Sequence, residues 1–236
     1  MQYLLPKVIY IEEEVWAMKM SKTRSEDAYP RTVPTRVTQA LNSLPQPLAS
    51  LSGRLKRELD IKLIYHCYFH TVDVIDQSIK LGLSARLCAR DLEIITIAAL
   101  FHDAGFLKRH HDNEPIGAEM AESAMRVVGD YSEGEISLVS QMILDTKLIT
   151  HECAQISNSR LSPYLLDADL SNLGRTIFWR QTNAVATEIG IDFDEFMPIT
   201  RDLMERHNWQ SESARKLYGE QKEKNVKELE LAISAL

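Results

Sequence analysis

Cysteine is scarce in this 236-residue chain, which contains only three. They are Cys67, Cys88 and Cys153, and no two of them form a C-x-x-C pair. An odd number without such pairs argues against a disulfide framework and against a cysteine-based zinc site. This usage fits a reducing compartment, so we expect a cytoplasmic protein.

Long apolar runs and an excess of positive charge are also lacking. No segment approaches the roughly 18 consecutive apolar residues that a membrane-spanning helix needs, and the first residues do not resemble a secretion signal. Asp and Glu total 34 against 27 Lys and Arg, for a net charge of −7. We therefore expect a soluble protein with no membrane and no nucleic-acid polymer as partner. Small phosphorylated ligands stay compatible, because a bound cation supplies positive charge locally.

Several catalytic motifs are absent, and glycine and proline are sparse. The chain has no G-x-G-x-x-G, no P-loop and no G-x-S-x-G. The early prolines, Pro30, Pro34, Pro45 and Pro47, predict a break between an N-terminal extension, residues 1–47, and a main domain, residues 48–236. Within the extension we expect a short helix over residues 8–20 and a loop over residues 21–36.

Beyond residue 48 the apolar residues recur at intervals of three and four, which predicts an all-α domain. Helices are expected at residues 61–81, 92–101, 115–128, 133–144 and 162–173, and from residue 211 to the end. Alternating runs typical of strands are not found. In the first of these helices His66 and His70 fall on the face opposite the apolar stripe, so they are expected to point the same way.

Three groups of polar residues interrupt these helices. His66 and His70, one turn apart, can jointly reach one metal ion, although such a pair is also common on a solvated face. His102 and Asp103 follow a helix that is apolar all round, where an ionised carboxylate is costly unless it is paired or metal-bound. The alternative is that the helix emerges into solvent there, with Gly105 as its stop.

The third group is Asp167 and Asp169, and aspartate is a poor residue for a helix interior. Positions two apart diverge by about 200° on a helix, so only one of the pair can face the cation that the histidines face. We expect the other to brace a neighbour or cap a helix.

In this order the groups resemble the HD superfamily of metal-dependent phosphohydrolases. The segment YHCYFHTVDV (residues 65–74) is similar to the family's first ligand helix, AALFHDAGF (98–106) to its signature turn, and LDADLSNLG (166–174) to its closing motif. DNE (112–114) resembles a downstream acidic segment of some bacterial members. RHNW (206–209), with Lys222 and Asn225, resembles the tail of one bacterial branch. The resemblance covers roughly residues 60–230 and leaves the N-terminal extension outside.

The resemblance implies an HD-type helical bundle in which His70, His102, Asp103 and Asp169 hold one divalent cation, with Asp167 in reserve. Two imidazoles and two carboxylates suit Mn, Fe, Co, Ni or Zn better than calcium, and Mg is retained as a candidate. The implied reaction is hydrolysis of a small phosphate ester, such as a nucleotide, by metal-activated water. Monoesters and diesters are both open, and a homodimer is compatible with the sequence.

Further roles are expected for residues near these ligands. His66 resembles the histidine with which cyclic-nucleotide phosphodiesterases protonate the leaving oxygen, but Cys67 stands where they have asparagine, so cyclic-nucleotide activity does not follow. Glu114 is a candidate for orienting the attacking water. The candidates for binding substrate phosphate are Lys108, Arg109, His111, Lys147 and Arg175. For the basic cluster at residues 108–111, a solvated loop is the alternative.

Two other functions stay open. A second metal would need spare histidines, and the central region offers only His110, His111 and His151. We therefore favour one metal, but two irons would indicate an HD-type di-iron oxygenase. The other alternative is a non-catalytic sensor that binds a nucleotide or a metal and signals through the N-terminal extension.

Overall fold

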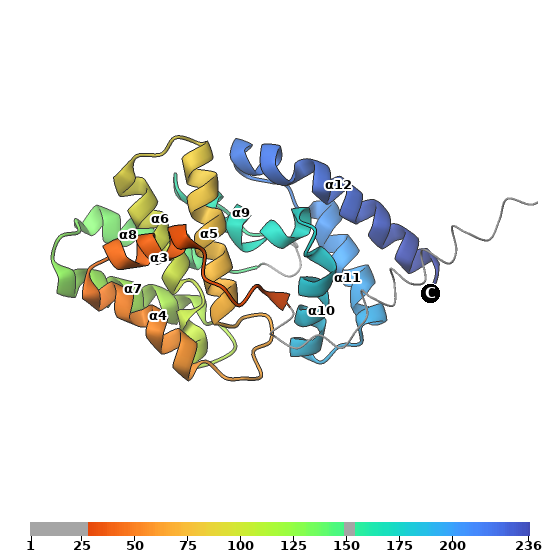
Figure 1. Ribbon diagram of the computed structural model, residues 1–236, viewed down its shortest axis with the longest axis horizontal. Helices are drawn as coiled ribbons and strands as arrows, with labels where there is room; N and C mark the ends of the chain where they lie inside the picture. The colour runs from red at the N-terminus through yellow and green to blue at the C-terminus, as the bar shows by residue number, and fades with distance from the viewer. Residues whose placement is uncertain (1–27, 149–153) are drawn as a thin grey trace, which may run out of the picture.

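The computed structural model describes residues 28–148 and 154–236. Every regular element in these two ranges is a helix and none is a strand, which confirms the all-α prediction (Figure 1). The helix expected at residues 8–20, and also His151 and Cys153, lie outside the described residues. Among the described helices, none is long and apolar enough to cross a membrane.

The elements follow one another along the chain without long gaps. They are α3 (Thr35–Ser43), α4 (Gln46–Glu58), α5 (Tyr68–Ser84), α6 (Ala89–Phe101), the 3-10 helix η1 (Ala104–Leu107), α7 (Glu114–Val128), α8 (Glu133–Asp145), α9 (Ser162–Asp169), the 3-10 helix η2 (Ser171–Gly174), α10 (Phe178–Ile189), α11 (Phe193–Arg206) and α12 (Glu212–Ser234).

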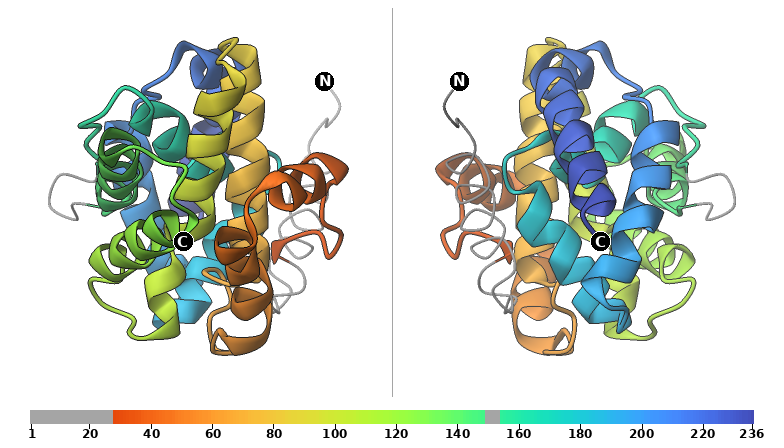
Figure 2. Two further views of the ribbon diagram at one scale, coloured as in Figure 1. Left: turned by 90° about the vertical axis from the view of Figure 1, so that its left-hand side faces the viewer. Right: turned by 90° about the vertical axis from the view of Figure 1, so that its right-hand side faces the viewer.

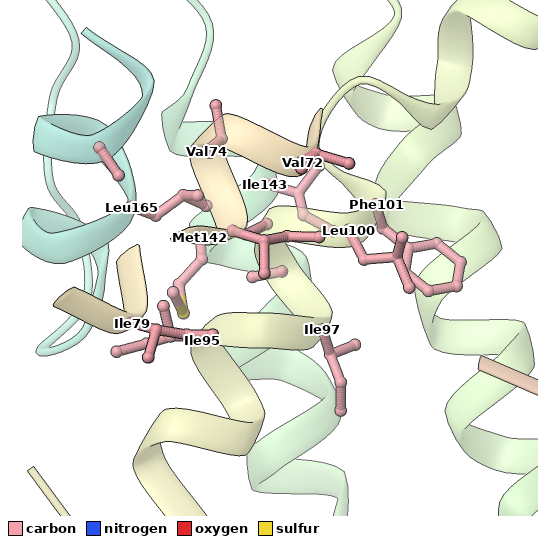
Figure 3. Close-up of a cluster of buried hydrophobic side chains, with 14 of the residues drawn as sticks. Val72, Val74, Ile79, Ile95, Ile97, Leu100, Phe101, Met142, Ile143 and Leu165 are labelled. Carbon is pink, nitrogen blue, oxygen red and sulfur yellow. The ribbon is translucent and has the colours of Figure 1, made fainter. Parts of the chain in front are cut away.

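Helix α6 lies at the centre of the core. Its residues from Ile94 to Phe101 are all buried, because the sequence there offers no charged side chain and the helix is packed by α4, α5, α7, α8 and α9. The one hydroxyl in this stretch, Thr96 Oγ1, donates to the carbonyl of Leu92 at 2.7 Å. Figure 3 shows part of this core, with side chains of Val72, Val74, Ile79, Ile95, Ile97, Leu100, Phe101, Met142, Ile143 and Leu165.

The helices form two groups around α5 and α9. Figure 1 shows α3, α4, α6, α7 and α8 on one side and α10, α11 and α12 on the other. Helix α12 packs on α11 and η2, and the right-hand view of Figure 2 shows α11 and α12 side by side. Because α5 and α9 contact each other between the two groups, side chains from both groups can meet near the end of α6.

The expected domain boundary near residue 48 falls inside α4. Val37 of α3 and Leu48 of α4 belong to the same buried cluster as the residues of α5, α6 and α8. Residues from Thr35 onward are therefore part of the main core rather than of a separate extension, and the loop expected up to residue 36 ends where α3 begins.

Two of the expected helices differ from the structure. Helix α5 begins at Tyr68 rather than near residue 61, so His66 precedes the helix. The helix expected over residues 162–173 ends at Asp169, and the chain continues as η2. Helices α3, α4, α10 and α11 have no counterpart among the expected ones.

A candidate metal centre between three helices

Three side chains from separate helices converge at the end of α6. They are His70 of α5, His102 at the C-terminal end of α6 and Asp169, the last residue of α9, and one ligand atom from each lies within 4.8 Å of the others. The Nε2 atom of His70 is 3.1 Å from Asp169 Oδ1 and 3.3 Å from His102 Nε2. Both histidines are buried. This group could hold a metal ion.

Asp103 adds a fourth candidate ligand atom, a carboxylate oxygen, beside this group. Its Oδ2 atom lies 3.1 Å from His102 Nε2 and 3.5 Å from His70 Nε2. This oxygen is buried, and it has no hydrogen-bond partner among the described residues. A buried carboxylate oxygen without a partner is costly, and a cation between two imidazoles and two carboxylates would satisfy it. The residues present therefore fit a divalent cation.

The electrostatics of the group favour a cation too. Burial acts to lower the pKa of His102, but the adjacent Asp103 carboxylate raises it to about 9. Burial acts to raise the pKa of Asp103 and of Asp169, yet the charge of His102 on Asp103 and the hydrogen bond of His70 to Asp169 hold both below their ordinary range. Both carboxylates stay ionised, so a cation that binds there would displace a proton from His102.

His102 is oriented by its own helix. Its Nδ1 donates to the carbonyl oxygen of Ala99 at 2.8 Å, which leaves the Nε2 of the neutral ring as the lone-pair atom that faces the site.

The turn after His102 needs Gly105, since a Cβ at this position would lie 2.0 Å from the carbonyl oxygen of Asn113. Gly105 thus allows the turn to approach the start of α7; it is not a left-handed helix stop.

Tyr29 and Gln155 contact two of the candidate ligands, His70 and Asp169, at the atoms that do not face the cation group. The sequence analysis identified neither residue. The Tyr29 hydroxyl lies 3.0 Å from His70 Nδ1. Gln155 Nε2 donates to Asp169 Oδ2 at 2.7 Å and to the carbonyl of Thr146 at 2.7 Å. Asp169 therefore has one oxygen occupied by Gln155 and one that faces the histidines.

Asp167 faces away from the cation group and braces the segment that begins α12, one of the two roles expected for the second aspartate. Its Oδ1 accepts from the Gln210 N–H at 2.8 Å, and its Oδ2 accepts from the Ser211 N–H at 2.7 Å. Ser211 is the N-cap residue of α12. Asp167 thus ties the start of α12 to α9, and its two oxygens are both in use.

His66 lies beside the group, although it is not on the helix face that the sequence predicted. Its ring centroid is 5.7 Å from that of His70, and it stacks on Phe106 with centroids 4.8 Å apart. The position is fixed by Glu188 of α10, whose Oε1 pairs with His66 Nδ1 at 2.5 Å. Glu188 Oε2 accepts from the N–H groups of Tyr65 and His66 at 2.7 and 3.0 Å. These bonds hold the backbone N–H groups of Tyr65 and His66 outside a helix, which explains why α5 begins only at Tyr68.

Burial acts to lower the pKa of His66, but the hydrogen bond with Glu188 and the negative charges of Asp103 and Asp169 raise it above its ordinary value overall. Glu188, like Tyr29 and Gln155, has no sequence signal of its own, since a single polar residue far from the motifs forms no pattern.

The predicted phosphate-binding residues occupy different surroundings. Arg175 donates to both oxygens of Asp73, at 2.6 and 3.0 Å. Lys147 pairs with the Asp112 carboxylate at 2.5 Å, and Arg109 donates to the Asp112 carbonyl at 2.7 and 3.0 Å.

Of the remaining candidates, Lys108 and His111 are exposed, and Glu114 has a buried carboxylate oxygen. Lys108 lines a groove between α4 and α7, and His111 is exposed on the same loop, as the solvated-loop alternative predicts. Glu114, the first residue of α7, has a buried Oε2 with no hydrogen-bond partner among the described residues.

Within residues 28–148 and 154–236 no second group of three His, Cys, Asp or Glu residues has metal-ligand spacing.

No family model matches the chain, and no curated protein matches its sequence. The fold and the site thus define an all-α protein with a buried His/Asp group that could bind a metal ion.

Proposed function

We propose that this protein is a metal-dependent phosphohydrolase of the HD type that acts on a small phosphate ester such as a nucleotide. One observation carries the proposal: the His, His-Asp and Asp residues of the sequence motifs converge at one point. His70 Nε2 and Asp169 Oδ1 lie 3.1 Å apart although 99 positions separate them in the chain. Asp103 supports a set of four ligands, because its buried oxygen takes part in no hydrogen bond among the described residues.

The ligand set supports Mn, Fe, Co, Ni, Zn or Mg as the cation. A divalent cation held there would polarise a phosphoryl oxygen and lower the pKa of a bound water. The chain's own contribution is to fix the ligand atoms, through Ala99 for His102 and through Gln155 for Asp169. The burial of both histidines excludes bulk water from the inner side of the site.

His66 is the residue that we propose to protonate the leaving oxygen. Its Nδ1 is engaged by Glu188, which leaves Nε2 free to transfer a proton. The His66 side chain is 28% exposed, against 3% for His70, so a substrate can reach it. Glu188 acts as the positioning residue for this imidazole.

We keep Glu114 as the candidate for orienting water, because its buried oxygen has no hydrogen-bond partner in the part of the chain that the structure describes. Contact with substrate phosphate is proposed for Lys108, Arg109, His111, Lys147 and Arg175. For Lys147, Arg109 and Arg175 this requires exchange of an existing partner for phosphate.

The proposal is tested by ester hydrolysis with defined cations. Purified protein treated with chelator and reloaded with Mn²⁺ is incubated with a nucleotide panel, a monoester and a diester, and released phosphate and nucleoside are measured. We expect turnover that chelator removes and Mn²⁺ restores, that His102→Ala abolishes, and that Lys216→Ala, on the exposed face of α12, leaves unchanged. Absence of hydrolysis with every cation would contradict the proposal.

Metal stoichiometry separates this function from the di-iron alternative. The single His/Asp group within the described residues supports one cation per chain, which elemental analysis measures directly. Two irons per chain together with oxygen consumption would favour oxidative chemistry. A nucleotide that raises the melting temperature without being consumed would favour a sensor instead.

A further inference from the structure

Tyr29 reaches the metal centre from the segment that precedes α3. It is buried, and it belongs with Ala28, Tyr65 and Ala184 to a small apolar cluster separate from the main core. Its ring lies beside those of Tyr65 and His70, with centroid distances of 6.0 and 5.9 Å. The amide of Gln181 on α10 donates to the Ala28 carbonyl at 3.5 Å. Tyr29 is thus held from α5 and from α10.

The hydroxyl of Tyr29 meets the ring nitrogen of His70 that faces away from the cation group. The Oη–Nδ1 distance is 3.0 Å, across 41 positions of the chain, while His70 Nε2 faces Asp169 and His102. When Nε2 gives its lone pair to a cation it carries no hydrogen, so the neutral ring carries its hydrogen on Nδ1. That N–H then donates to Tyr29 Oη.

We propose that Tyr29 is a positioning residue of the metal centre, which fixes the ring of His70 so that Nε2 faces the cation. The inference deepens the proposed function and rests on its metal site. His102 obtains the same orientation from the carbonyl of Ala99 in its own helix, whereas His70 depends on a residue far away in the sequence. The segment before α3 is therefore part of the cation site, not only a covering for it.

Cation affinity tests this role without any substrate. The dissociation constant for Zn²⁺ is measured by competition with a chromophoric chelator for the full-length wild type, Tyr29→Phe and Tyr131→Phe. Loss of a hydrogen-bond partner of a metal-bound histidine typically weakens binding about 10- to 100-fold, and we expect this for Tyr29→Phe.

Tyr131→Phe is the matched control. It removes another buried tyrosine hydroxyl, one that donates to Glu93 at 2.6 Å, and we expect it to leave the affinity for Zn²⁺ unchanged. Equal affinities of Tyr29→Phe and wild type would overturn the inference, and so would an equal loss in both variants.

A measurement on the wild type covers the case in which Tyr29→Phe does not fold. In the Zn²⁺-loaded protein, nitrogen-correlated NMR identifies which nitrogen of His70 bears hydrogen and how fast it exchanges with water. We expect a slowly exchanging Nδ1–H, whereas coordination through Nδ1, or rapid exchange, would overturn the inference. Tight Zn²⁺ binding without ester hydrolysis would end the phosphohydrolase proposal and leave this one intact. A wild type with no affinity for divalent cations would end both.

Discussion

The Nε2 atoms of His70 and His102 lie 3.3 Å apart, although the residues are 32 positions apart in the chain. Two imidazole nitrogens at this distance repel each other if both present lone pairs, unless a proton or a cation lies between them. Asp103 and Asp169 add two carboxylates around the same point. This relationship makes cation binding the property on which most of the following predictions depend.

Asp169→Asn should mainly affect cation affinity and Asp167→Asn mainly the stability of the fold, because the two carboxylates have different partners. Asp169→Asn removes a ligand charge, so we expect at least a 100-fold loss of Zn²⁺ affinity with a small change in the stability of the metal-free protein. Asp167→Asn replaces an acceptor of two backbone N–H groups with an amide that can accept only one well, which should cost about 1–3 kcal/mol of unfolding free energy. Chelator competition and urea unfolding measure the two quantities. The reverse pattern would mean that Asp167 is the ligand.

Glu188→Gln should impair turnover while leaving the cation in place. The amide still accepts backbone N–H groups, but it holds the His66 imidazole less firmly than a carboxylate does. A positioned general acid is worth about 100- to 10,000-fold in rate, and partial loss of its position should lower kcat roughly 10- to 100-fold. Steady-state kinetics at saturating Mn²⁺ gives the value, with Glu195→Gln on the exposed side of α11 as the control. An unchanged kcat would remove His66 from the proposed chemistry.

Gly117→Ala should disturb the turn that carries His102. A Cβ at Gly117 would lie 2.5 Å from the carbonyl oxygen of Phe101, so α7 or the end of α6 must shift, at a cost of roughly 1–3 kcal/mol. We also expect weaker Zn²⁺ binding. Gly219→Ala in α12 is the matched control, since a Cβ there meets nothing within 4 Å and alanine should stabilise the helix by about 0.5–1 kcal/mol. Equal stabilities for both variants would show that the close approach is not needed.

The protein should lose stability in mild acid, because the buried His207 ring stays neutral in the folded state. Burial, and then the charge of Lys222, lower its pKa to about 3, and its Nδ1 is buried without a partner among the described residues. The folded state keeps this ring neutral, whereas the unfolded chain binds a proton below a pKa of about 6.5. The stability contribution is therefore complete above that pH and falls progressively toward pH 3.

By pH 5 the loss should reach about 2 kcal/mol. Urea unfolding of chelator-treated protein at pH 7.5 and 5.0 measures it. The variant His207→Gln should remove this part of the pH dependence. Identical pH dependence in wild type and variant would contradict the assignment.

Much of the fold was predictable from apolar periodicity and from helix boundary residues. Helices α6, α7, α8 and α12 begin and end within a few residues of their expected positions, and α8 begins with a capping box formed by Ser132 and Glu135. Helix α4 was missed because the early prolines predicted a linker, although Pro47 occupies the first turn of the helix, where proline is favourable. Helix α11 contains Pro198, which weakens any prediction of a continuous helix.

The candidate site, like the fold, was predictable from the sequence only in part. The four proposed ligand positions came from the resemblance to the HD superfamily, which also favoured Asp169 over Asp167. Helix geometry predicted only that one of these two aspartates could face a cation. The residues that orient the ligands were not predictable. Tyr29 acts across 41 positions and Glu188 across 122, and such contacts depend on how helices pack, not on any local pattern.

The 99 positions between His70 and Asp169 also bear on how the chain would acquire a cation at this group. A nascent chain that ends before α9 has two imidazoles and one carboxylate but not the oxygen that completes the set, and α9 joins α5 only when that part of the domain packs. Metal capture by the full set of proposed ligands would therefore be a late event in synthesis. A chain that stalls before α9 would lack one of these ligands.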